Sequence, residues 1–140
     1  MRRKARAAAL QVLFQMDVGK LSLEDALTSV AAPDWVPDDL TWVETLCRGT
    51  RGHLGEIDPV IAQCAERWTL ERMAAVDRNI LRLAIFELRY TDTPIRVVIN
   101  EAVELAKRFS TEESGRFVNG LLGKIVRSTT PPLVGHAADV

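Results

Sequence analysis

Basic and aromatic side chains fall on the same side of the first predicted helix. Four of the first six residues are basic: Arg2, Arg3, Lys4 and Arg6. At about 100° per residue, Arg3 and Arg6 share one ridge of this helix with Leu10 and Phe14. Guanidinium groups pair with phosphates and a ring offers a surface on which a base can stack, so the ridge predicts binding of single-stranded RNA. The alternative is that Leu10 and Phe14 make a second contact with the core.

A second pattern of this kind lies toward the C-terminus. This part of the chain contains five basic residues: Lys107, Arg108, Arg116, Lys124 and Arg127. Phe117 lies about 100° from the centre of the apolar stripe of its helix, on a ridge with Gly120 and Lys124. Gly120 leaves space for a base to approach Phe117, and we expect Lys107, Arg116 and Lys124 to contact phosphates. The alternative for Gly120, which costs a helix roughly 1 kcal/mol relative to alanine, is close helix packing.

Sequence patterns of catalysis and metal binding are absent. No phosphate-binding glycine loop, nucleophile elbow or HExxH motif occurs. Glu101 and Glu104 lack a nearby histidine and are typical of a solvated helix face. Cys47 and Cys64 form no CxxC pair, which predicts small buried residues of a reduced, cytoplasmic protein rather than a zinc site. The sequence therefore predicts a protein that is not an enzyme and uses no metal or cofactor.

Length and charge limit the remaining classes. The chain has 140 residues, of which 47% are hydrophobic, and a net charge of −1. No apolar run approaches the roughly 20 residues that span a bilayer, and polar residues interrupt the first helix, which argues against a membrane protein or a secretory signal. A nearly neutral protein can still bind a polyanion through local basic zones. The alternative for the basic N-terminus is a solvated, flexible segment.

Helical periodicity dominates the chain and predicts an all-α fold of about seven helices. The predicted helices span about 3–18, 22–30, 38–52, 58–68, 71–91, 94–109 and 110–127. Their end signals are Gly19 as a C-terminal glycine, Ser22 as an N-cap, Asp58 with Pro59 as an N-terminal pair, and Ser110 with Glu113 as a capping box. The helix at 71–91 is apolar on nearly all sides, which predicts a central position.

These elements predict one domain at residues 1–128, built as two small helical bundles that share a core. Its halves span about 1–68 and 69–128. The tail at 129–140 follows two prolines and is expected to be flexible.

Five stretches of the chain resemble the NusB family, over about residues 2–127. They are RRKAR at 2–6, ALQVLF at 9–14, VDRNILRLAIFEL at 76–88, VINEAVELAK at 98–107 and FVNGLL at 117–122. The last two strings are the most specific. The loop at 31–37, which contains Trp35, matches no motif of the family, and the basic N-terminal block is shorter than in some relatives.

The resemblance implies an all-helical factor of bacterial transcription antitermination. Such a factor binds boxA-type single-stranded RNA of nascent ribosomal RNA together with NusE, a ribosomal small-subunit protein, and acts on RNA polymerase with other Nus factors. By similarity, the basic N-terminal segment, Phe14 and Phe117 belong to the RNA surface. The positions of Asp77 and Arg82 resemble the face that meets NusE. Glu113 matches a position next to the RNA surface whose charge tunes assembly, and it is expected among the contacts with NusE.

The resemblance leaves two points open. Similar domains also begin ribosomal-RNA cytosine methyltransferases as RNA-binding modules, an alternative that requires this chain to be a fragment of a longer enzyme. A purely structural adaptor that binds protein alone would leave the two basic and aromatic faces unexplained. Some relatives form dimers that hide the RNA surface, so a homodimer is also open.

Overall fold

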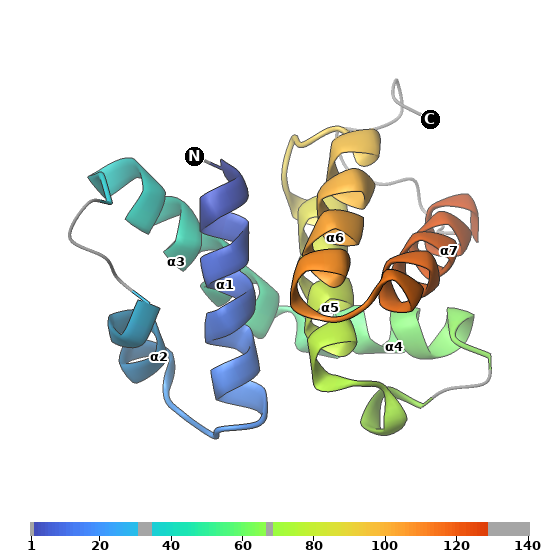
Figure 1. Ribbon diagram of the computed structural model, residues 1–140, viewed down its shortest axis with the longest axis horizontal. Helices are drawn as coiled ribbons and strands as arrows, with labels where there is room; N and C mark the ends of the chain where they lie inside the picture. The colour runs from blue at the N-terminus through green and yellow to red at the C-terminus, as the bar shows by residue number, and fades with distance from the viewer. Residues whose placement is uncertain (1, 31–34, 67–68, 129–140) are drawn as a thin grey trace.

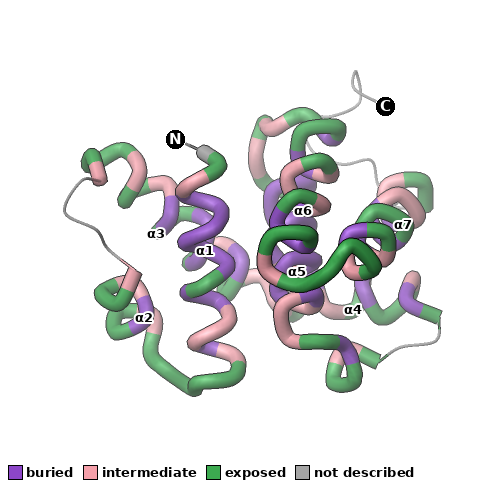
Figure 2. The backbone as a smooth tube through the Cα atoms, in the orientation of Figure 1, coloured by how far each residue is buried: buried purple, intermediate pink, exposed green. Residues whose placement is uncertain are grey.

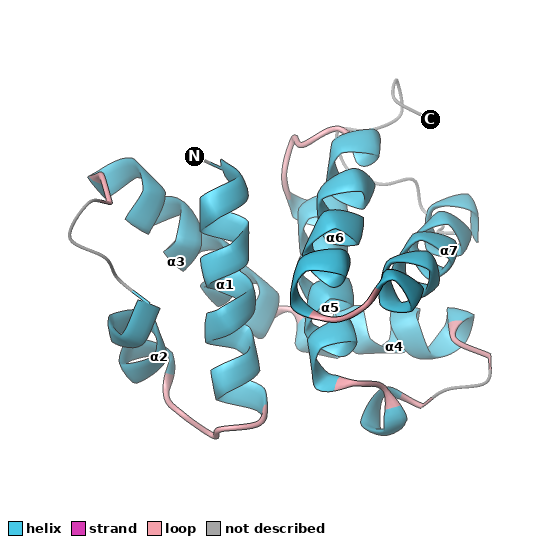
Figure 3. Cartoon of the chain, in the orientation of Figure 1, coloured by secondary structure: helices cyan, strands magenta, loops and turns pink. Residues whose placement is uncertain are grey.

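The computed structural model describes residues 2–30, 35–66 and 69–128, and for Arg2 it describes the backbone alone. These residues form seven α-helices, one 3-10 helix and no strand, which confirms the predicted all-α fold (Figure 3). The elements are α1 (Arg2–Asp17), α2 (Leu23–Val30), α3 (Pro37–Gly52), α4 (Leu54–Cys64), η1 (Leu70–Arg72), α5 (Ala75–Tyr90), α6 (Ile95–Phe109) and α7 (Glu112–Ser128). Within the described ranges, no helix is both long and apolar enough to cross a membrane.

The helices form two groups that meet at α5. Helices α1, α2 and α3 lie together on one side, and α4, α6 and α7 surround α5 on the other (Figure 1). Ten residues of α5 are buried, and it contacts α1 and α3 as well as α4, α6 and α7, so its predicted central position is confirmed (Figure 2). The division into halves near residue 68 stays a prediction, and the tail at 129–140 lies outside the described residues.

The predicted start of the fourth helix is wrong because backbone contacts, rather than a capping side chain, set it. Helix α4 begins at Leu54 and contains Pro59 in its interior, so Asp58 and Pro59 do not start it. It follows α3 directly through His53, whose N–H donates to Gly49 O at 3.1 Å and whose carbonyl accepts from Ile57 N at 2.9 Å. The His53 ring nitrogen Nδ1 also lies 2.7 Å from Gly49 O, at the end of α3. No side chain caps the first turn of α4, and therefore no N-cap signal in the sequence marked its start.

The helix predicted at 71–91 is divided into η1 and α5. Met73, between them, has extended backbone angles, φ −67° and ψ 149°. The guanidinium of Arg78 donates to the carbonyls of Leu70 at 2.9 Å and Met73 at 3.3 Å, so it satisfies backbone acceptors at the break. A long-range side-chain contact of this type cannot be read from helical periodicity.

Local end signals are partly confirmed. Ser22 caps α2 as predicted, because its Oγ accepts from Asp25 N–H at 3.1 Å. At α7 the cap is Thr111, whose Oγ1 accepts from Ser114 N–H at 3.0 Å, so the predicted box of Ser110 with Glu113 is wrong by one residue. The left-handed residue after α1 is Lys20, with φ 58°, not Gly19.

A buried ion pair joins α1 to α5. Arg6 is 5% exposed and Glu87 is 2% exposed. Arg6 Nε and Nη2 each donate to one carboxylate oxygen of Glu87 at 2.8 Å. Because both groups have lost their water, each depends on the other for compensation of its charge. The prediction that Arg6 contacts RNA phosphate is therefore wrong: its guanidinium is enclosed and already paired.

Removing the guanidinium should unfold the protein more easily. We expect Arg6→Ala to lower the free energy of unfolding by about 3–5 kcal/mol, because the Glu87 carboxylate would remain buried without its counter-charge. Urea denaturation followed by circular dichroism measures this loss. The double variant Arg6→Met with Glu87→Leu removes both charges and should recover most of the stability. Wild-type stability of Arg6→Ala together with weakened RNA binding would return Arg6 to the RNA surface.

Candidate nucleic-acid interface

The basic and aromatic ridge of α1 exists, but its middle is buried. Leu10 is a core residue, as the alternative for it proposed, and Arg6 pairs with Glu87 beside it. The two ends of the ridge, Arg3 and Phe14, reach the surface. The ridge therefore faces α5 and α6, and only its ends are available to a ligand.

Arg3 is held against α6 by a carboxylate. Its Nε and Nη2 donate to Glu101 Oε1 at 3.0 Å and Oε2 at 2.8 Å. This hydrogen bond lowers the pKa of Glu101, although burial of the carboxylate opposes the shift. The Arg3 side chain remains largely exposed, so its outer side is open to a phosphate. Glu101 is thus a positioning group for Arg3 and not merely a solvated helix residue. The side chain of Arg2 lies outside the described part.

Phe14 lines a small hollow, called here the aromatic pocket. Its lining residues are Leu10, Gln11, Phe14, Gln15, Val76 and Phe109, and its volume is about 200 Å³. Phe14 is half-buried, so its ring is neither a core residue nor fully solvated. Phe109, at the end of α6, was not selected from the sequence, because only the fold brings that helix end beside α1. The pocket offers two aromatic rings within one apolar hollow.

Phe117 lines a second hollow, called here the α7 pocket, of about 380 Å³. Its lining residues are Arg72, Met73, Ala74, Asp77, Glu113, Ser114 and Phe117. The structure thus brings Phe117 together with two of the three residues predicted for the partner face. Val76 lines the aromatic pocket and the next residue, Asp77, lines the α7 pocket, so the first turn of α5 contributes a side chain to both hollows.

Asp77 is a buried carboxylate with incomplete hydrogen bonding. It is 8% exposed, and its Oδ2 accepts from the Ser114 hydroxyl at 3.3 Å. Its Oδ1 has no hydrogen-bond partner among the described residues. Burial raises the pKa of Asp77, and the Ser114 hydrogen bond opposes that shift only partly. Asp77, which lines the α7 pocket, therefore keeps one buried carboxylate oxygen without a hydrogen-bond partner among the described residues.

The remaining predicted contacts on α6 and α7 are surface residues. A Cβ at Gly120 would meet no atom within 4 Å, so close packing does not explain this glycine. Among the glycines of α7, Gly115 has the closest neighbour, since a Cβ there would lie 3.0 Å from Lys107 Cγ. Arg116 is exposed, and Lys107 Nζ lies 3.9 Å from Glu104. Lys124 Nζ pairs with Glu66 at 3.2 Å and does not line the pocket of Phe117.

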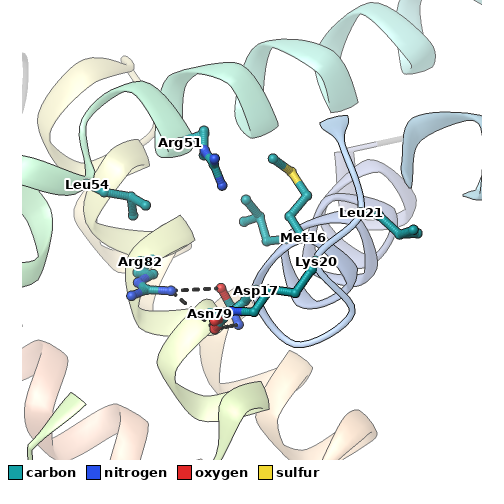
Figure 4. A pocket seen from close by; sticks show the side chains of 9 residues that line it. Met16, Asp17, Lys20, Leu21, Arg51, Leu54, Asn79 and Arg82 are labelled. Carbon is teal, nitrogen blue, oxygen red and sulfur yellow. Dashed lines mark hydrogen bonds and ion pairs between the residues drawn. The ribbon is translucent and has the colours of Figure 1, made fainter. Parts of the chain in front are cut away.

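Arg82 lies apart from Asp77 and Glu113. Its Nε and Nη2 donate to the two carboxylate oxygens of Asp58 at 2.9 Å, and its Nη1 donates to Asp17 at 3.3 Å. Figure 4 shows Arg82 with Asp17 and Asn79 at the wall of a third hollow, about 340 Å³ in volume, which Lys20 and Arg51 also line. The three predicted partner contacts therefore occupy two separate hollows.

Asp17 connects the end of α1 to α5 in this cluster. Its Oδ2 accepts from Arg78 Nε at 2.8 Å and from Asn79 Nδ2 at 3.0 Å. Burial alone would raise the pKa of Asp17, but the hydrogen bonds from Arg78 and Asn79 lower it below its usual value. The sequence interpretation missed Asp17 because it appeared only as a polar interruption of the first helix.

Residues 2–30, 35–66 and 69–128 contain no group of three His, Cys, Asp or Glu side chains that could hold a metal ion. Cys47 is buried as predicted, and burial, with a smaller effect of Glu44, raises the pKa of its thiol to about 12. Cys64 is only half-buried, so the prediction of a buried residue is wrong for it.

Comparisons with known proteins agree on one family. The NusB family model matches residues 3–127. The chain is 50% identical over 136 residues to "Transcription antitermination protein NusB" of Symbiobacterium thermophilum, covering 90% of this chain and 89% of that protein. The structure of T. maritima NusB matches with a TM-score of 0.87 at 39% identity, covering 94% of each chain. A chain from a complex of antitermination factors NusB and NusE with dsRNA matches with a TM-score of 0.83 at 27% identity, covering 91% of this chain and 97% of that one.

The raised pKa of Asp77 predicts a pH-dependent effect of Asp77→Asn. A carboxyl with a raised pKa in the folded state contributes stability at low pH that is lost as the pH rises through that value. We therefore expect Asp77→Asn to raise the free energy of unfolding by about 1 kcal/mol near pH 7. The advantage should vanish at acid pH, where Asp77 is protonated. Urea midpoints of both proteins across this range measure the difference, and a difference that does not change with pH would contradict the prediction.

Proposed function

The chain belongs to the NusB family, and from this premise we propose that it is a transcription antitermination factor that binds boxA-type RNA together with NusE. Its targets are nascent ribosomal-RNA transcripts, and it acts on RNA polymerase with other Nus factors. The names of the relatives support this function. In this chain the proposal depends mainly on one observation: Phe14 and Phe117 line two hollows that both reach the first turn of α5, and α1, α6 and α7 carry the exposed cations Arg3, Lys107 and Arg116.

The RNA side of the proposal uses the two pockets and the cations around them. Bases stack against Phe14 in the aromatic pocket and Phe117 in the α7 pocket. Phosphates meet the cations of α1, α6 and α7. These cations are Arg2, Arg3, Lys4, Lys107, Arg116 and Lys124. Arg6 is not among them, because its guanidinium is buried.

The protein side of the proposal uses the unused acceptor of Asp77. A hydrogen-bond donor from NusE that reaches Asp77 Oδ1 would compensate a buried carboxylate that is otherwise incompletely paired. Glu113 lines the same pocket and adds negative charge to it. Arg82 belongs to the separate hollow of Figure 4, where its pair with Asp17 fixes part of the wall that a partner would meet. Arg82 also pairs with Asp58.

The proposed role is that of a binding protein in the cytoplasm, without catalysis and without a cofactor. The alternative, an RNA-binding module of a ribosomal-RNA cytosine methyltransferase, would use the same RNA surface. The relative from Symbiobacterium thermophilum, matched over 89% of its own length, is named as an antitermination protein, which favours the first function.

Phe117 provides the most local test of the RNA surface. We expect Phe117→Ala to weaken binding of a boxA-type RNA by roughly 1–3 kcal/mol, the contribution of one stacked base. Because Phe117 is half-buried, its loss should destabilise the fold by less than the 3–5 kcal/mol typical of a fully buried phenylalanine. Fluorescence anisotropy and the melting temperature, measured side by side, separate the two effects. Intact RNA binding, or a far lower melting temperature, would make Phe117 a core residue.

Two variants of Gly120 provide a matched control for Phe117→Ala. Its Cβ position is open, so Gly120→Ala should raise the stability of α7 by about 1 kcal/mol. Gly120→Leu should keep the fold and weaken RNA binding, because its side chain would stand where the base approaches Phe117. Equal RNA affinity of the alanine and leucine variants would place the base elsewhere.

The aromatic pocket and the α7 pocket both use the first turn of α5, which predicts that RNA and NusE bind cooperatively. Adding NusE should tighten RNA binding, and RNA should tighten NusE binding by the same factor, since the coupling free energy is reciprocal. Titration of each ligand in the presence and absence of the other measures both factors. A single strand should also bind more tightly than a duplex of the same sequence, whose stacked bases cannot reach the rings. Equal RNA affinity with and without NusE would contradict the shared surface.

A further inference from the structure

A groove next to the aromatic pocket is lined by residues that the proposed RNA surface leaves largely unused. Helix α1 forms its floor, Trp35 one wall, and Arg108 at the end of α6 the other. Its volume is about 470 Å³. Three of the described residues that line it are cations, Arg3, Lys4 and Arg108, and none of them is acidic. The groove thus combines positive charge with an aromatic ring.

Trp35 presents its ring to this groove from a fixed position. The side chain is partly buried and packs against the hydrophobic core. Lys4 Nζ lies 5.1 Å from the centre of the ring, a distance at which a cation and an aromatic face attract each other. Two of the α1 residues that line the groove, Ala7 and Ala8, have short side chains that leave space between the longer ones. An aromatic wall next to a cation suits a base and its phosphate.

The groove is continuous with the aromatic pocket. Gln11 lines both hollows. The guanidinium of Arg108 lies 4.8 Å from the ring centre of Phe109, which lines the aromatic pocket. A strand with a base at Phe14 therefore has the groove next on its path along α1.

We propose that this groove binds one further nucleotide of the RNA, with its base against Trp35 and its phosphate between Lys4 and Arg108. The inference rests on the proposed RNA-binding function and extends it to Trp35, two residues before α3. An acidic segment of a protein would pair with the same cations, but it would leave the aromatic wall without a matching group. The ring and the cations together favour a nucleotide.

The test compares RNA lengths in the full chain. A series of fluorescein-labelled boxA-type RNAs, lengthened by single nucleotides at either end, is titrated into wild-type protein and into Trp35→Ala. In the wild type, affinity should rise at least about fivefold at one step of the series, the lower limit for a base stacked on an aromatic side chain. Trp35→Ala should lose this step and keep wild-type affinity for the shorter RNAs. Trp35→Phe, which keeps a ring, should keep part of the step.

Charge variants make the test independent of the fold around Trp35. Arg108 is exposed, so Arg108→Ala should fold normally, reduce the same step and flatten the dependence of affinity on salt. Arg127→Ala removes an equal charge from an exposed site on α7 that does not line the groove, and it should leave the step unchanged.

Three results would overturn the inference. A full step in Trp35→Ala, or no step in the wild type, would exclude the groove as a nucleotide site. A step that survives while Trp35→Ala loses binding of a polyglutamate peptide would assign the groove to a protein segment. If the wild type binds no RNA of any length, the proposed function fails and the inference fails with it. The affinity for the shortest RNA distinguishes this last result from the others.

Discussion

The buried pair of Arg6 and Glu87 determines how the first helix lies on the rest of the molecule. Any rotation of α1 about its axis would separate two charges that have almost no access to water. Arg3, one turn earlier on the same ridge, pairs with Glu101 of α6 and holds the same orientation. Asp17 fastens the other end of α1 to α5 through Arg78 and Arg82. Ion pairs at both ends and in between thus set the residues of α1 that reach the surface.

The ion pairs of α1 explain why the buried Arg6 affects the proposed RNA surface without being part of it. With Arg6 and Leu10 against α5, Phe14 is placed beside Val76 of α5 and Phe109 of α6. The aromatic pocket therefore consists of side chains from three helices whose relative positions depend on the ion pairs. The ion pairs of α1 also direct Lys4 and Gln11 toward the groove that Trp35 lines. The ion pairs of α1 thus determine which of its side chains line the surface hollows.

The sequence was sufficient for the helices and for the central place of α5, because both follow from the spacing of apolar residues. It was not sufficient to distinguish a helix face in solvent from a face against another helix. Arg3 and Arg6 look equivalent on α1, yet the partner of Arg6 lies 81 residues away along the chain. The junction at His53 and the break at Met73 were missed for a related reason, since backbone and long-range contacts define them. The two pockets depend on tertiary structure in the same way.

The first turn of α5 gives a physical basis for communication between RNA and a protein partner. Val76 lines the aromatic pocket, and Asp77 lines the α7 pocket. A ligand that fills either hollow therefore meets the same turn of α5. A donor that reaches Asp77 Oδ1 would favour its ionised form and order the wall beside Phe117. Ordering that wall once serves both ligands, so coupling can arise from a shared turn without movement of either half of the molecule.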